Sequence, residues 1–112
     1  VGPQSVPPRR VMAGTISLGP QERWSVASWL FDWTVEFLAD RVAEREVRAS
    51  LREIVEENLG WLGLGDFGPE PEREMRGLLR DEVVEAADTT FAADMADREA
   101  VLGHLRDLAA RV

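Results

Sequence analysis

The sequence predicts an all-α fold, a compact four-helix bundle-like domain preceded by an extended N-terminal arm. Two observations support this prediction. Apolar residues recur at helical spacing through most of residues 20–112, and glycine or Gly-Pro signals stand where helices would begin or end. The 112 residues are enough for one domain with its own core. We therefore assign residues 1–19 to the arm and residues 20–112 to a single helical domain.

The first predicted helix runs from Pro20 to about Val42 and contains three of the four tryptophans. Proline suits the first position of a helix because its missing N–H has no helical partner there. The apolar residues form two adjacent stripes that span roughly 200°, a wider arc than a surface helix needs. This helix is therefore expected at the centre of the bundle. Its predicted core residues are Ala27, Leu30, Phe31, Phe37 and Leu38.

A narrow polar strip follows the same helix and carries Asp32 and Glu36 beside Trp29. Two interpretations of Trp29 are open. It is either half-buried with its N–H toward water, or an exposed anchor for a partner, since tryptophan is enriched at binding hot spots. Trp29, Asp32 and Glu36 are accordingly candidate partner-binding residues.

Three more helices complete the predicted bundle. The apolar pattern turns by roughly 90° around residues 43–46, which indicates a break there. The second helix then ends at Gly60, because glycine is the preferred residue after a helix. A third helix starts at Pro69 and ends near Asp88, and Asp94 is the expected N-cap of the fourth.

The N-terminal arm contains an apolar run of extended character, Val11–Leu18. No second strand pattern follows in the sequence, so this run has no strand of the same chain to pair with. Its backbone N–H and C=O groups then need other partners. The arm is expected either to pair with its copy in a homodimer or to lie across the helices. Val11, Ile16 and Leu18 would hold it there.

Composition bounds the partners and the location. The net charge is −8, and all 13 basic residues are arginine. Acidic surface repels phosphate backbones and anionic lipid, so nucleic acid and membrane are excluded as partners and a basic protein is favoured. No run approaches the ~18 apolar residues of a membrane span, which favours a cytoplasmic location. The bias toward Ala, Arg, Glu, Leu, Val and Gly is typical of a GC-rich bacterial genome.

The inventory of reactive side chains argues against an enzyme. The chain has no lysine, cysteine or tyrosine, and His104 is its only imidazole. A single histidine without a nearby Glu-x-x-His pair does not encode a di-iron or zinc site. Ser25 and Ser28 have no base within one helical turn, so neither is an activated nucleophile. We therefore predict no catalytic residue, no metal ligand and no cofactor.

A glycine-rich segment between the second and third helices matches G-x-G-x-x-G at Gly63–Gly68. A dinucleotide site needs a strand before this motif and a helix N-terminus after it. Here the preceding residues are expected to be helical and acidic residues follow, so a flexible loop without nucleotide is predicted. Trp61 and Phe67 flank or lie in this loop, where they either pack into the core or join a partner-binding patch.

These observations favour a non-enzymatic protein–protein interaction module, an acidic adaptor or an inhibitor or immunity-type protein that covers a basic partner. Two alternatives stay open. One is a structural homo-oligomer that uses the arm and the Trp-rich face. The other is a small-ligand-binding helical domain with a pocket under the glycine-rich loop, where His104 or glutamates would act.

Overall fold

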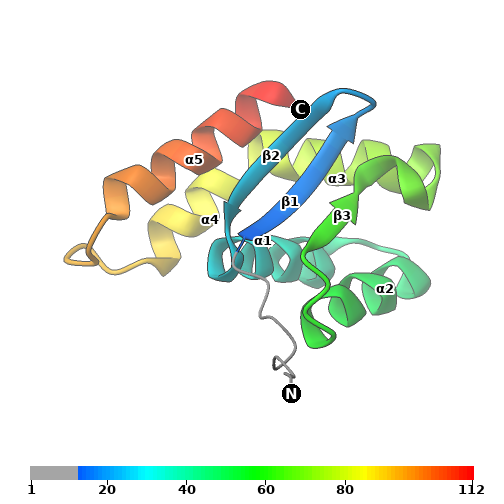
Figure 1. Cartoon of the computed structure of the whole chain (residues 1–112), viewed down its shortest axis with the longest axis horizontal. Coiled ribbons are helices and arrows are strands. Elements are labelled where there is room, and N and C mark those ends of the chain that lie inside the picture. Colours follow the sequence, from blue (N-terminus) through cyan, green and yellow to red (C-terminus); the bar gives the residue numbers. More distant parts are fainter. Residues whose placement is uncertain (1–12) are drawn as a thin grey trace, which may run out of the picture.

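The computed structural model describes residues 13–112 and shows a mixed α/β fold, so the all-α prediction is wrong. A three-stranded sheet lies against helices, which still form most of the molecule (Figure 1). In chain order the elements are β1 (Ala13–Gly19), β2 (Glu22–Ala27), α1 (Ser28–Arg41), α2 (Arg45–Glu56), β3 (Trp61–Gly63), the 3₁₀ helix η1 (Leu64–Phe67), α3 (Pro69–Asp81), α4 (Val83–Thr90) and α5 (Arg98–Arg111).

The first correction concerns the start of the predicted first helix, which is a β-hairpin. β1 and β2 pair antiparallel, with Trp24 opposite Ile16. Along β2 the side chains alternate, since Trp24 and Val26 are buried and Ser25 between them is exposed. Pro20 lies in the hairpin turn, and α1 begins only at Ser28. A Gly-Pro pair suits a turn as well as a helix start, which is why the signal misled.

The second correction concerns β1, which has neighbours on both sides within the chain. The strand order is β2-β1-β3, and β3 runs parallel to β1 with Leu62 beside Ile16. The Thr15 N–H donates to the Gly60 carbonyl at 3.0 Å. The expectation that no second strand exists was therefore wrong, and β1 needs no copy of itself to satisfy its backbone. The predicted arm before Ala13, including Val11, lies outside the described residues.

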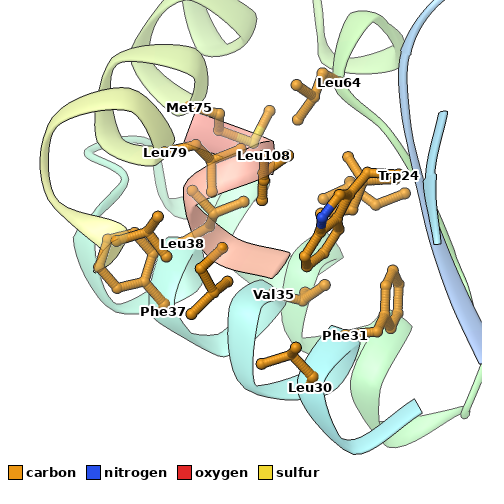
Figure 2. Close-up of a cluster of buried hydrophobic side chains, with 14 of the residues drawn as sticks. Trp24, Leu30, Phe31, Val35, Phe37, Leu38, Leu64, Met75, Leu79 and Leu108 are labelled. Carbon is orange, nitrogen blue, oxygen red and sulfur yellow. The ribbon is translucent and has the colours of Figure 1, made fainter. Parts of the chain in front are cut away.

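The core lies between one face of the sheet and the helices. Figure 2 shows Trp24 of β2 pointing into this space, toward the side of α1 that carries Val35 and Phe31. Phe31 packs so closely on β1 that a Cβ placed on Gly14 would stand 2.1 Å from its ring. Four of the five predicted core residues are buried, whereas Ala27 is exposed at the end of β2. The confirmed residues are Leu30, Phe31, Phe37 and Leu38.

The later helices agree with the predicted pattern in part. α2 begins at Arg45, which confirms a break within residues 43–46. The predicted third helix is divided at Glu82 into α3 and α4. The last helix, α5, begins after Asp97 rather than after Asp94. α4 and α5 lie side by side and are joined by a turn that projects from one end of the molecule (Figure 1).

Candidate partner-binding site

The outward face of α1 carries aromatic and acidic side chains in two adjacent columns. Residues four apart on a helix lie on one face, about 6 Å apart along its axis. One column has Trp29 and Trp33, and the other has Asp32, Glu36 and Asp40. All five side chains are exposed or partly exposed. We call these five residues the α1 strip.

Phe91, the residue that follows α4, packs against both rings of the aromatic column and holds them in position. The Trp29 and Phe91 ring centroids are 5.9 Å apart with an edge-on geometry, and those of Trp33 and Phe91 are 5.1 Å apart. Trp33 also stacks on Phe37 at 5.8 Å. Such pairs contribute about 0.5–1.5 kcal/mol each beyond the burial of area. Trp29 nevertheless stays 45% exposed. Its ring is therefore fixed by Phe91 and still accessible to another molecule.

Arg98 at the start of α5 keeps Phe91 in place. Its Nη2 donates to the Asp88 carbonyl at 2.9 Å and to the Asp88 carboxylate at 2.7 Å. Its Nε donates to the Phe91 carbonyl at 3.3 Å. The Arg98 side chain is 19% exposed and that of Asp88 is 64% exposed, so the buried part of these charge-assisted bonds is on the Arg98 side and water reaches the carboxylate. The turn between α4 and α5 is thereby fastened beside the aromatic column.

The acidic column contains one carboxylate with a basic partner and two without a partner among the described residues. Asp40 is paired with Arg52 at 2.9 Å. Within residues 13–112, no basic side chain lies within ion-pair distance of Asp32 or Glu36. Burial raises the pKa of the Asp32 carboxyl above its ordinary value, and the negative charge of Glu36 raises it further. A cation placed at these two carboxylates would relieve their repulsion.

A hollow of about 420 Å³ opens where the strip begins, and we call it the Trp29 hollow. Its walls come from the end of β2, the start of α1, the turn between α4 and α5, and α5 itself. Most of the lining is apolar, and methionine there is adaptable in shape. Its lining includes Val26, Trp29, Met95 and Val101, and the polar residues Asp97 and His104.

The structure brings together only three of the five residues predicted to bind a partner. Trp29, Asp32 and Glu36 share the α1 strip. Trp61 is 43% exposed on the outer face of the sheet, with the Arg23 guanidinium 5.5 Å above its ring. Phe67 is partly buried in η1 and packs against the core. A single patch containing all five is therefore not formed.

The glycine-rich motif has a strand before it, so one reason given against a nucleotide site was wrong. β3 leads directly into η1, and Gly68 takes a positive φ of 98° before α3 begins. The first turn of α3 has fewer of the donors that hold phosphate, because Pro69 and Pro71 have no backbone N–H and the Glu72 N–H donates to the Gly68 carbonyl at 3.0 Å. Glu70 and Glu72 add negative charge at the same place. The absence of nucleotide binding stays a prediction, which now depends on the prolines and glutamates at the start of α3.

Several residues of the site were not foreseen as functional. Trp33 was not among the candidate residues, although its four-residue spacing from Trp29 could have indicated a shared outward column. Phe91 and Met95 carry no local signal, because they reach α1 only through the fold. His104 was noted as an imidazole without partners, and it lies exposed at the rim of the Trp29 hollow.

Comparisons with known proteins assign no family, because the chain matches no family model, no curated protein and no solved structure. No helix within residues 13–112 has the length and apolar character needed to cross a membrane. Over the same residues, no three acidic, histidine or cysteine side chains converge as a metal site requires. A functional proposal therefore depends on the geometry of the α1 strip.

Proposed function

We propose that this protein is a non-enzymatic interaction module that binds a basic protein partner through the α1 strip. One observation carries the proposal. Asp32 and Glu36 have no counter-ion among the described residues, and they stand beside the accessible ring of Trp29. A carboxylate pair next to an exposed aromatic ring suits the guanidinium and ammonium groups of another protein.

The chemistry of these two columns is complementary to arginine and lysine. A guanidinium over an indole gains about 0.5–1 kcal/mol at an exposed site, and more where water is excluded. The long aliphatic stems of basic side chains also cover apolar rings while the charged ends reach carboxylates. Within this chain, Arg41 already shows the arrangement, since its guanidinium stands 4.1 Å from the Phe37 ring centroid.

The alternative of a homo-oligomer loses its main support. That alternative started from an unpaired β1, and β1 is paired with β2 and β3 in the structure. Two copies facing each other through the α1 strip would also bring the carboxylates of Asp32 and Glu36 together. Like charges at close range disfavour such a contact.

The test is affinity capture from a lysate of the source organism at low and high salt. Three baits are compared, namely the unchanged chain, the Asp32→Asn/Glu36→Gln double variant, and Trp61→Ala as a control at the other exposed tryptophan. The unchanged chain and the control should capture the same basic protein at low salt and lose it at high salt, since salt screens exposed charge.

The double variant should lose the captured protein at both salt concentrations, while its thermal unfolding shows an intact fold. Capture of an acidic protein, or equal capture by the double variant, would overturn the proposal. Capture that fails only in Trp61→Ala would move the binding surface to the sheet and would equally overturn it.

A further inference from the structure

We infer that the partner docks through an amphipathic helical segment that places one large apolar side chain in the Trp29 hollow and two basic side chains on Asp32 and Glu36. This inference rests on the proposed function and adds the chemistry and spacing of the docking segment. It follows from three features of the site: the hollow, the spacing along α1, and the charges at the far end of the strip.

The Trp29 hollow accepts an apolar anchor. Its volume of about 420 Å³ falls within the range of pockets that hold ligand groups. Val26, Val101 and Met95 supply apolar walls, and Trp29 forms an edge shared with the α1 strip. Anchors in such pockets dominate the energy of interfaces because they are fully removed from water. A leucine, methionine or aromatic side chain of the partner fits this description.

The spacing along α1 sets where the basic side chains must follow. Asp32 and Glu36 lie about 4.5 Å and about 10.5 Å beyond Trp29 along the helix axis, at 1.5 Å per residue. A partner helix lying along α1 has the same rise. Basic residues about one turn and two turns from its anchor would therefore stand over the two carboxylates.

The far end of the strip limits the length of the basic segment. Asp40 is already paired with Arg52, and Arg41 lies over the Phe37 ring. Arg41 is also within ion-pair distance of Glu82, at 3.9 Å. This end of the strip, away from the hollow, therefore offers no carboxylate without a partner to a further basic side chain. The site therefore selects an anchor followed by a short basic stretch rather than an extended polycation.

A second copy of this chain does not fit the same site. The chain has a net charge of −8, and its α1 strip would meet another acidic surface. Charge complementarity therefore favours a different, basic protein as the occupant. Self-association of the full chain, if it were seen and were lost in Trp29→Ala, would overturn the inference.

The test uses three synthetic, alanine-based helical peptides and the full chain. The matched peptide carries one leucine with arginines three and seven residues after it, which reproduces the axial spacing of about 4.5 Å and about 10.5 Å. The permuted peptide has the same composition and the same four-residue spacing between its arginines, but these stand two and six residues after the leucine, on the face of the helix away from it. In the third peptide, alanine replaces the leucine. Fluorescence anisotropy of labelled peptides at low salt gives the dissociation constants.

The matched peptide should bind about tenfold or more tightly than either of the other two, a difference of the size that one buried anchor provides. Trp29→Ala should reduce its affinity to that of the peptide without leucine, while Trp61→Ala should leave it unchanged. Equal binding of all three peptides, or no binding of any, would overturn the inference. The proposed function would survive that result if capture of a basic protein still depended on Asp32 and Glu36.

Discussion

Trp29 and Trp61 are almost equally exposed, at 45% and 43%, but their surroundings are opposite in kind. Trp61 lies on the sheet beneath Arg23, so a cation of the same chain already covers its ring. Trp29 is held edge-on by Phe91, with Asp32 nearby on the same helix face and no cation among the described residues paired with that carboxylate. Exposure alone therefore does not mark a binding residue. The two tryptophans differ in their electrostatic surroundings, because the carboxylate near Trp29 has no basic partner among the described residues.

The largest expected loss of stability comes from a substitution on the buried face of α1, the helix that carries Trp29. Phe31 is fully buried against Gly14 of β1, so Phe31→Ala should lower the free energy of unfolding by about 3–5 kcal/mol. Glu36→Ala on the exposed face of the same helix should change it by less than about 0.5 kcal/mol. Urea denaturation measures both. A cost below about 1 kcal/mol for Phe31→Ala would show that α1 is not held as described.

A smaller loss of stability is expected when Arg98 is removed. Arg98 bonds to Asp88 and to Phe91, which packs against Trp29, and Trp61 has no such support among the described residues. Arg98→Ala removes the bonds to Asp88 and Phe91 and should destabilise the fold by about 1–2 kcal/mol. Arg106→Ala, whose pair with Glu99 is 4.0 Å long and exposed, should cost under about 0.5 kcal/mol. Thermal unfolding followed by circular dichroism compares the two.

Loss of Phe91 packing in Arg98→Ala should also expose Trp29 to acrylamide quenching, because Phe91 then no longer covers its edge. The measurement needs a background with Trp61→Phe, so that the second exposed indole does not contribute. Equal destabilisation by the two arginine variants, or unchanged quenching, would mean that Arg98 does not hold the aromatic column.

The smallest expected effect is a gain of stability in Asp32→Asn. Burial, with a further contribution from Glu36, raises the pKa of Asp32 in the folded protein. The folded state therefore holds this proton more tightly than the unfolded chain, and the charged carboxylate destabilises the fold above the raised pKa. Removing the charge should raise stability at pH 7 by up to about 0.5 kcal/mol. The gain should shrink as the pH falls toward the ordinary value of 3.8.

Melting temperatures of the unchanged chain and Asp32→Asn between pH 7 and pH 4 test this expectation. Asp94→Asn, in the exposed turn between α4 and α5, is the matched control and should give no such pH-dependent gain. A loss of stability in Asp32→Asn at pH 7 would indicate a structural role for the carboxylate. Stability gained together with partner binding lost would instead support a role in recognition.

Helical parts of the fold could be predicted where the apolar pattern was long enough. The pattern around Phe31 and Leu38 identified the buried face of α1, and the change of phase identified the break before α2. The sheet was missed for a physical reason. Trp24 and Val26 also fit the helical spacing that continues into α1, and β3 has only three residues, too few to show a period of two.

Only the part of the candidate site that lies on α1 could be predicted from the sequence. Trp29, Asp32 and Glu36 were grouped correctly because helical spacing places them on one face. Trp61 and Phe67 were added because they are large apolar residues in or beside the glycine-rich segment, and the fold places them on other elements. The parts contributed by the turn between α4 and α5 depend on tertiary packing, which local spacing does not encode.

The most direct measurement follows the four indole N–H signals of the full chain by NMR while the matched peptide is added. Each tryptophan reports one region, and single Trp→Phe variants assign the signals. The account predicts that the Trp29 and Trp33 signals shift in proportion to the bound fraction, while the Trp61 signal stays in place. A shift of Trp61 with Trp29 and Trp33 unchanged, or equal shifts of all three, would contradict the assignment of binding to the α1 strip.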